Sequence, residues 1–277
     1  MGQCGGIGQR KVGGHALRDC VDNAQHSRAW NPYMTQTKVA LITGSARRIG
    51  AGIARRLHAA GYNVALHAHT SQAELQALAQ ELESLRAGST LTLQADLRDT
   101  AQLPDLVAQC VARFGRLDAL VNNASNFYPT PLHEATPAQW DDLFAVNARA
   151  PLFLAQAAAS QLRQHGGAIV NLTDLHAEQP LRAHPLYSAA KAALAMLTRS
   201  LALELAPQVR VNAIAPGAIL WPDAGKDAAA QQALLARTPL ARTGQVEEIA
   251  DTVRWLLDDA SFVTGQTVRV DGGRGLT

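Results

Sequence analysis

The chain has 277 residues, of which 47% are hydrophobic, 17% charged and 5% aromatic. This length and composition suit one large folded domain and exclude a collagenous or low-complexity chain. The formal net charge is +2, and residues 1–33 carry it, with four basic and two acidic side chains. The rest of the chain is therefore neutral overall and lacks the broad basic surface that nucleic-acid binding requires.

Neither a metal site nor a membrane segment is expected. The three cysteines are too few for a disulfide framework, and no Cys-x-x-Cys or Cys/His spacing typical of a metal site occurs. No apolar run approaches the roughly 20 residues that span a bilayer, and the N-terminus lacks the apolar stretch of a signal peptide. We therefore expect a cytoplasmic protein without a membrane or nucleic-acid partner.

Residues 1–33 differ from the rest of the chain. They are rich in Gly, Gln, Asn and Arg and show neither strand alternation nor helical periodicity. This pattern predicts a disordered N-terminal extension, followed by one domain over residues 34–277. Met34 lies just before the first apolar run and is a candidate for the true initiator.

From Lys38 onward, short apolar runs alternate with amphipathic stretches. The predicted strands are 38–43, 63–68, 90–94, 117–121, 168–172, 209–214 and 267–270. The predicted helices lie near 49–60, 73–87, 100–114, 138–164, 186–206 and 246–258. This alternation predicts a single doubly wound, Rossmann-type α/β domain with a seven-stranded parallel sheet, whose ligands bind beyond the carboxyl ends of the strands.

The turn after the first predicted strand has the composition of a phosphate-binding loop. Gly44 and Gly50 flank this turn and would let backbone N–H groups approach a diphosphate at a helix N-terminus, although an ordinary turn would look similar. Arg48 stands where such loops usually have their middle glycine. Its guanidinium could face a phosphate or an anionic or hydrogen-bonding substrate, or it could simply be solvated.

The end of the second predicted strand favours NADPH over NADH. NAD-preferring sites place Asp or Glu here, whereas residues 67–71 contain no carboxylate. His67 and Ser71 could donate hydrogen bonds to a 2′-phosphate. Asp96-Leu97 and Asn122–Ser125 follow the next two strands and suit adenine and ribose recognition, or they cap their loops.

Three side chains after the fifth predicted strand suggest proton transfer. Asp174 ends that strand, Tyr187 follows thirteen residues later, and Lys191 lies four residues beyond. Positions i and i+4 project from one helix face, so the phenol and the ammonium should converge. We expect the ammonium to lower the pKa of Tyr187 and make its phenol a usable proton donor. Asp174 could instead cap a helix or a loop.

These motifs, together with Asn147, Pro216-Gly217 and the closing Val270–Gly273, resemble the short-chain dehydrogenase/reductase family over nearly all of Lys38–Thr277. The resemblance implies catalytic roles for Asp174, Tyr187, Lys191 and Asn147, with Asn147 anchoring its helix and a proton-relay water behind Lys191. It also implies a cofactor site made of Gly44, Arg48, Ile49, Gly50, His67, Ser71, Asp96, Leu97, Asn123, Ala124, Ser125, Tyr187, Lys191, Pro216, Gly217 and Ile219.

Three departures from the common family pattern look like the pteridine reductase branch. Asp174 replaces the usual Ser, Arg48 replaces the middle Gly, and residues 123–131 read NASNFYPTP. This resemblance implies NADPH-dependent reduction of dihydropterins such as dihydrobiopterin or dihydromonapterin, with dihydrofolate as a further candidate. Hydride would pass from the nicotinamide to a pterin ring carbon. The implied substrate-binding residues are Arg48, Ser125, Phe127, Asp174, Tyr187 and Trp221.

Several alternatives remain open at this point. Phe127, which would stack on the pterin, could be loop packing, and Trp221 could pack against a neighbouring subunit. Related pteridine reductases often have Arg where Thr70 stands. A carbonyl or 3-oxoacyl reductase of the same family would have Ser at position 174, and a non-catalytic NADPH-sensing protein would not need its Tyr and Lys. Apolar helices at 138–164 and 186–206, with the resemblance, suggest a homotetramer.

Overall fold

Seven short apolar segments form one parallel sheet with the strand order β3-β2-β1-β4-β5-β6-β7. Every residue of the interior strand β1 is fully buried, as expected where helices cover both faces of a parallel sheet. The strands are β1 (Val39–Ile42), β2 (Asn63–Ala68), β3 (Thr90–Gln94), β4 (Ala119–Asn122), β5 (Ala168–Leu172), β6 (Arg210–Pro216) and β7 (Thr267–Val270). The predicted doubly wound α/β fold with seven parallel strands is confirmed.

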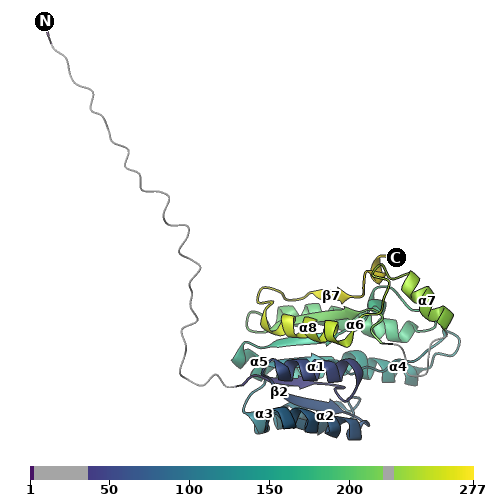
Figure 1. Ribbon diagram of the computed structural model, residues 1–277, viewed down its shortest axis with the longest axis horizontal. Coiled ribbons are helices and arrows are strands. Elements are labelled where there is room, and N and C mark those ends of the chain that lie inside the picture. Colours follow the sequence, from purple (N-terminus) through teal and green to yellow (C-terminus); the bar gives the residue numbers. More distant parts are fainter. Residues whose placement is uncertain (3–36, 221–227) are drawn as a thin grey trace. The chain divides into compact units, whose positions relative to one another are not determined.

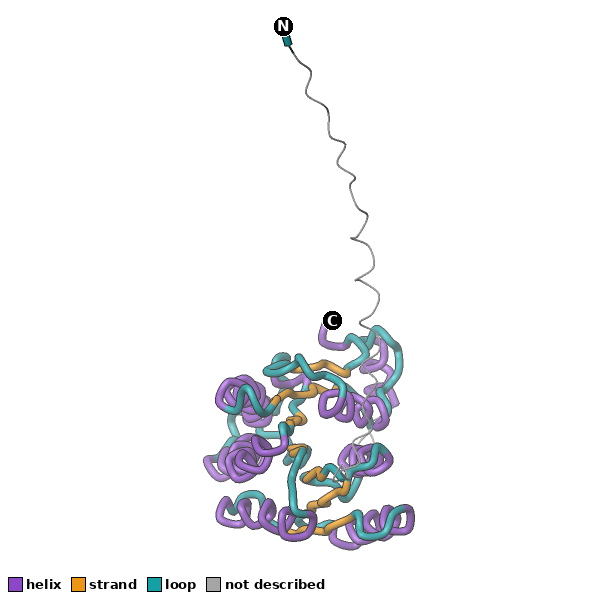
Figure 2. Tube along the Cα trace, turned by 90° about the vertical axis from the view of Figure 1, so that its left-hand side faces the viewer, coloured by secondary structure: helices purple, strands orange, loops and turns teal. Residues whose placement is uncertain are grey.

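Two layers of helices enclose the sheet, and Figure 2 shows the strands between them. One layer contains α1 (Arg48–Ala59), α2 (Gln72–Leu85) and α8 (Val246–Asp258), whose buried aliphatic side chains form one core cluster. The other contains α3 (Leu103–Phe114), α5 (Ala150–His165) and α6 (Pro185–Glu204), which form the second cluster. In Figure 1, α8 lies beside α1, although nearly 200 residues separate them in the sequence.

The predicted helix over 138–164 is interrupted. A capping box between Thr136 and Gln139 starts α4 (Pro137–Phe144), a π-helical turn follows at Ala145–Arg149, and α5 continues from there. The structure also contains α7 (Ala228–Ala236), which the sequence analysis did not predict. None of its described side chains is buried, so it lacks the amphipathic pattern that would indicate a helix.

The computed structural model describes residues 1–2, 37–220 and 228–277, and Thr37–Thr277 form one compact unit. The predicted disorder of residues 1–33 therefore lies outside the described residues except at the first two. Within the described ranges, no helix is both long and apolar enough to cross a membrane. The same residues contain no group of three or more His, Cys, Asp or Glu side chains able to hold a metal ion.

Candidate active site and dinucleotide cavity

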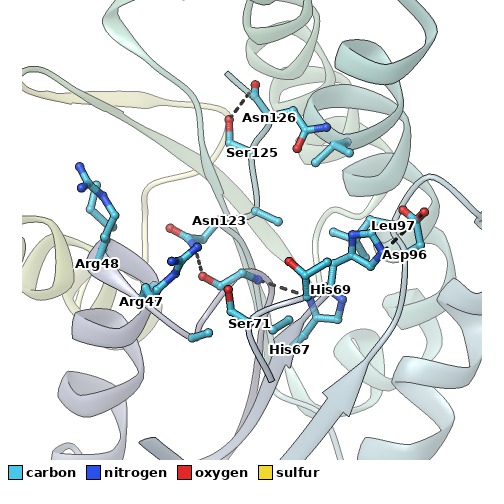
Figure 3. Close-up of a pocket in the computed structure, with 18 of the residues that line it drawn as sticks. Arg47, Arg48, His67, His69, Ser71, Asp96, Leu97, Asn123, Ser125 and Asn126 are labelled. Atoms are coloured by element: carbon cyan, nitrogen blue, oxygen red, sulfur yellow. Dashed lines mark hydrogen bonds and ion pairs between the residues drawn. The ribbon is translucent and has the colours of Figure 1, made fainter. Parts of the chain in front are cut away.

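A cavity of about 590 Å³ lies at the carboxyl ends of β1 to β4, where strand order reverses on either side of β1. Ligands of doubly wound folds bind at such a switch point. Figure 3 shows how side chains from four separate turns converge on it. The structure thus brings together eleven of the predicted cofactor residues, namely Gly44, Arg48, Ile49, Gly50, His67, Ser71, Asp96, Leu97, Asn123, Ala124 and Ser125.

The turn between β1 and α1 packs closely against the turn after β4. Gly44 has a φ of +62°, and a Cβ atom there would lie 2.8 Å from the Cα of Ala124. A Cβ at Gly50 would lie 2.6 Å from Nδ2 of Asn123, which donates to the carbonyls of Thr43 and Gly44 at 2.9 Å. The N-terminus of α1 thereby faces the cavity with its partial positive charge, and this cradle fits the diphosphate of a dinucleotide.

Two adjacent arginines line this cavity, Arg48, which was predicted from the sequence, and Arg47, which was not. Arg48 has a φ of +54°, the left-handed conformation that the glycine usual at this position adopts freely. Arg47 lines the same cavity as Thr70 and Ser71, and its Nη1 lies 3.7 Å from Glu74 Oε1. Arg47 could have been predicted from the sequence, because it is a second basic residue between Gly44 and Gly50.

His67 does not have the donor role that the sequence analysis gave it. The ring is buried, its Nδ1 accepts from the Gly44 N–H at 3.3 Å, and its Nε2 donates to the Ala95 carbonyl at 3.1 Å. Burial lowers the pKa of His67 to about 4, so the ring stays neutral near pH 7. The predicted hydrogen bond to a 2′-phosphate is therefore wrong, because both nitrogens already hold neighbouring turns in place.

Asp174 and Tyr187 meet at the carboxyl end of β5. Asp174 Oδ1 accepts from the His176 N–H at 2.8 Å and caps a 3₁₀ turn (Leu175–Ala177), so the alternative capping role also applies. Its Oδ2 accepts from the Tyr187 hydroxyl at 2.7 Å. Tyr187 lies in the first turn of α6 and is only 4% exposed. A carboxylate and a phenol thus share one hydrogen bond at the carboxyl end of β5, and neither residue is among those that line the cavity described above.

Lys191 follows one turn later on α6 and is fully buried. Its Nζ donates to the Leu172 carbonyl at 2.9 Å and lies 5.8 Å from the centre of the Tyr187 ring. Burial, together with the Asp174 carboxylate, raises the pKa of Tyr187, so the expected lowering by Lys191 is wrong for this structure. Burial also lowers the pKa of Lys191 to about 8.

An exposed aromatic ring adjoins this pair. Phe127 is 56% exposed, meets Tyr187 edge to face with ring centres 4.8 Å apart, and stacks on His184 at the same distance. His184 was not predicted from the sequence, because it lies before Pro185 with no motif around it. Phe127 therefore has packing contacts within the protein, but over half of its surface stays accessible to a ligand.

Asn147 fastens the loop after β4. Within the π-helical turn, its Oδ1 accepts from the Ser125 hydroxyl at 2.7 Å and its Nδ2 donates to the Asn126 carbonyl at 2.9 Å. The amide therefore has protein partners on the loop after β4, and its predicted role with a water behind Lys191 stays a prediction. Its buried position identifies it as a residue that shapes the site.

The remaining predicted residues lie at the carboxyl end of β6. The Gly217 N–H donates to the Val270 carbonyl at 3.0 Å, and a Cβ at Gly217 would lie 2.6 Å from the Asp271 Cα. Ile219 is buried against Gly244. Pro216 ends the strand beside Val270. Trp221 lies outside the described residues.

The fold and the site together define a dinucleotide-dependent oxidoreductase of the Rossmann type. The family model described as enoyl-(acyl carrier protein) reductase matches residues 44–274. Pteridine reductase 1 of Leishmania tarentolae is 40% identical over 86% of this chain and 96% of its own length. The 3-oxoacyl-(acyl-carrier-protein) reductase of Staphylococcus aureus is 38% identical over 87% and 99%. L-xylulose reductase of Bos taurus is 37% identical over 84% and 95%.

This chain belongs to the short-chain dehydrogenase/reductase family. The relatives named above act on different substrates, as their names state, although they share the same scaffold. Since function in such a family depends on the site and not on the fold, the substrate has to be argued from the residues around Asp174 and Tyr187.

Proposed function

We propose that the protein reduces dihydropterins to tetrahydropterins with NADPH. The observation that carries this proposal is the 2.7 Å hydrogen bond from the Tyr187 hydroxyl to the Asp174 carboxylate, beside the exposed ring of Phe127. A carboxylate accepts hydrogen bonds from ring N–H groups, and an aromatic face suits a flat heterocycle. The similarity to pteridine reductase 1 supports the same substrate class.

The reduction adds a hydride to the carbon and a proton to the nitrogen of the substrate C=N bond. The strand-end cavity with the Gly44–Gly50 loop would hold NADPH, which would supply the hydride when bound. Tyr187 delivers the proton to the ring nitrogen, and Asp174, already its hydrogen-bond partner, returns one to the phenol from solvent. Lys191 in its protonated form would stabilise the transient phenolate of Tyr187.

The preference for NADPH rests on the charge at the end of β2. No carboxylate occurs among residues 67–71, and the cation of Arg47 lines the cavity together with Thr70 and Ser71. Asp96, which also lines it, is held by Arg98, and this contact lowers the pKa of Asp96 to about 2. A 2′-phosphate would therefore meet a guanidinium and hydroxyl donors at this position.

A 3-oxoacyl reductase is the second candidate, because a relative with that name is 38% identical over 99% of its length. A carbonyl oxygen requires a hydrogen-bond donor, whereas both oxygens of Asp174 act as acceptors in this structure, from the His176 N–H and the Tyr187 hydroxyl. A non-catalytic NADPH-sensing protein is the third candidate and would keep the fold without turnover.

One substrate panel separates these candidates. Consumption of NADPH and NADH is measured with dihydrobiopterin, dihydromonapterin, dihydrofolate and a β-ketoacyl thioester, for the wild type and for Asp174→Ser. We expect the wild type to reduce dihydropterins faster with NADPH, and the variant to lose most of that activity. Turnover of the thioester alone would replace the proposal with the second candidate, and no turnover of any substrate would favour the third.

The burial of Lys191 predicts opposite effects of pH on activity and stability. Because its pKa lies near 8, the ammonium is lost as pH rises from 7 to 9, and kcat/KM should fall in that range. The unfolded chain binds this proton up to about pH 10, so the free energy of unfolding should rise by up to about 3 kcal/mol between pH 8 and 10. Rate profiles and urea titrations test this, and a flat rate profile would contradict it.

We also propose that the protein is a cytoplasmic homotetramer. Phe153 on α5 and Met196 and Leu203 on α6 are exposed, which supports assembly through these two helices into a homotetramer. Light scattering measures the mass directly, and a monomer at micromolar concentration would contradict this assembly. A cytoplasmic location agrees with the supply of reduced nicotinamide cofactor that the proposed reaction needs.

A further inference from the structure

One carboxylate holds both neighbours of Phe127. Asp142, in the last turn of α4, accepts from Asn126 Nδ2 at 3.0 Å and from the Tyr128 hydroxyl at 2.9 Å, both at its Oδ2 atom. The side chain between them, Phe127, contacts His184 and Tyr187 instead. The two hydrogen bonds therefore fix the orientation of the segment Asn126–Tyr128. The ring of Phe127 in this segment adjoins Tyr187, one of the proposed reacting groups.

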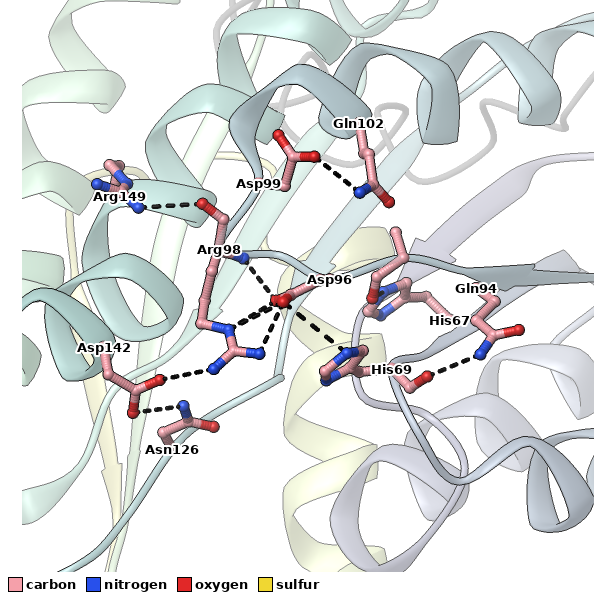
Figure 4. Close-up of polar contacts among 11 residues, drawn as sticks. His67, His69, Gln94, Asp96, Arg98, Asp99, Gln102, Asn126, Asp142 and Arg149 are labelled. Atoms are coloured by element: carbon pink, nitrogen blue, oxygen red, sulfur yellow. Dashed lines mark hydrogen bonds and ion pairs between the residues drawn. The ribbon is translucent and has the colours of Figure 1, made fainter.

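The second oxygen of Asp142 connects this segment to the cofactor cavity. Arg98 Nη1 lies 3.3 Å from Asp142 Oδ1, and the same guanidinium donates to Asp96 through Nε and Nη2 at 2.9 and 2.7 Å. Arg149, at the end of the π-helical turn, donates to the Arg98 carbonyl at 3.0 Å. Figure 4 shows the Arg98 guanidinium between the two carboxylates, with Asn126 next to Asp142.

Asp142 is partly buried and lies beside a cation and two hydrogen-bond donors. The carboxylate is 23% exposed, and Arg98 faces it with a charge opposite to its own. Burial and the hydrogen bond to Asp142 raise the pKa of Tyr128 to about 12, so its hydroxyl remains a donor. Tyr128 and Asn126 therefore both act as donors to Oδ2, while Arg98 faces the other oxygen.

We propose that Asp142 is a positioning residue, which sets the orientation of Phe127 and thereby the affinity for a flat heterocyclic substrate. It does not touch the reacting atoms, and it acts through Asn126 and Tyr128. This inference rests on the proposed function, since it assigns the Phe127 ring to the substrate. It extends that function by placing one determinant of substrate affinity on α4, outside the cavity.

A double-mutant cycle tests whether Asp142 acts through Phe127. Asp142→Ala should raise the KM for dihydropterin about tenfold, the size of one aromatic stacking contact, and change kcat much less. In a Phe127→Ala background, the same substitution should add no further rise. Asp141→Ala is the matched control, since it removes an exposed carboxylate from the same helix turn. Additive effects on KM in the two backgrounds would overturn the proposal.

A second measurement needs no turnover. The chain has five phenylalanines, so incorporation of 4-fluorophenylalanine gives five ¹⁹F signals, and Phe127→Leu identifies the one from Phe127. Asp142→Ala should shift that signal, whereas Asp142→Asn keeps an oxygen acceptor and should leave it near its wild-type position. An unchanged signal in Asp142→Ala, or an equal shift in both variants, would overturn the inference. Lack of dihydropterin turnover by the wild type would instead contradict the proposed function.

Discussion

Replacing Tyr187 with phenylalanine should lower kcat for dihydropterin reduction by a factor of roughly 10² to 10⁴, the usual contribution of a positioned general acid. The substitution removes only the hydroxyl that donates to Asp174 at 2.7 Å and keeps the ring that meets Phe127 edge to face. Cofactor affinity should change little, because the turn that would hold the diphosphate is untouched. Single-turnover rates measured with saturating NADPH provide the test.

Tyr62→Phe is the matched control for this prediction. Tyr62 is as buried as Tyr187, and its hydroxyl also donates to a carboxylate at 2.7 Å, that of Asp258. It immediately precedes β2, at the amino ends of the strands, whereas the site lies at their carboxyl ends. Both variants should lose about 1 kcal/mol of stability, but Tyr62→Phe should keep its kcat. Equal kcat values for the wild type and Tyr187→Phe would rule out the proton-donor role.

Replacing Gly50 with alanine should damage both folding and cofactor binding. The new Cβ would press against the Gly44 carbonyl and lie 2.6 Å from Asn123 Nδ2, which ties the loop to the end of β1. Overpacking of this kind costs about 1–3 kcal/mol, and the displaced amide adds about 1 kcal/mol for each hydrogen bond lost. We expect a marked fall in the melting temperature and at least tenfold weaker NADPH binding, measured by calorimetry.

Gly115→Ala separates the loss of stability from the loss of binding. Gly115 ends α3 with a φ of +78°, and nothing lies within 4 Å of a Cβ placed there. This variant should cost about 1 kcal/mol through backbone strain and bind NADPH normally. Wild-type NADPH affinity in Gly50→Ala would show that the close approach of the two turns is not required for the cofactor.

Much of the fold was readable from the sequence, because the strands of a parallel sheet are short and apolar on both faces. The bounds of β2, β3, β5 and β7 agree with the predicted ranges, and the others differ by one or two residues. Hydrophobic periodicity did not reveal the π-helical turn at Ala145–Arg149. A change in backbone hydrogen bonding leaves the residues on both sides apolar and helical, so the composition carries no sign of it.

The site was only partly readable, since the sequence indicates which residues follow each strand but not where their side chains point. Asp174 and Tyr187 could be paired because a strand end and a helix start meet at the same edge of the sheet. The contacts of His67 and Asn147 within the protein, and the stacking of His184 on Phe127, depend on turns that no local pattern specifies. Such contacts depend on how the folded chain brings the loops together, which the local sequence does not indicate.

The two hydrogen bonds that the His67 ring makes to neighbouring turns limit how the choice between NADPH and NADH could be re-engineered. An aspartate in place of His67 would face the Ala95 carbonyl. Because a carboxylate cannot donate a hydrogen bond, the carbonyl oxygen would lose the partner that it now has. The aspartate would also remove the side-chain contacts that now join the turns after β1 and β3, leaving only backbone hydrogen bonds such as Ser45 N–H to the His67 carbonyl. Redesign towards NADH should therefore start from Thr70, which is exposed, and Ser71, which is half-buried, and leave the imidazole in place.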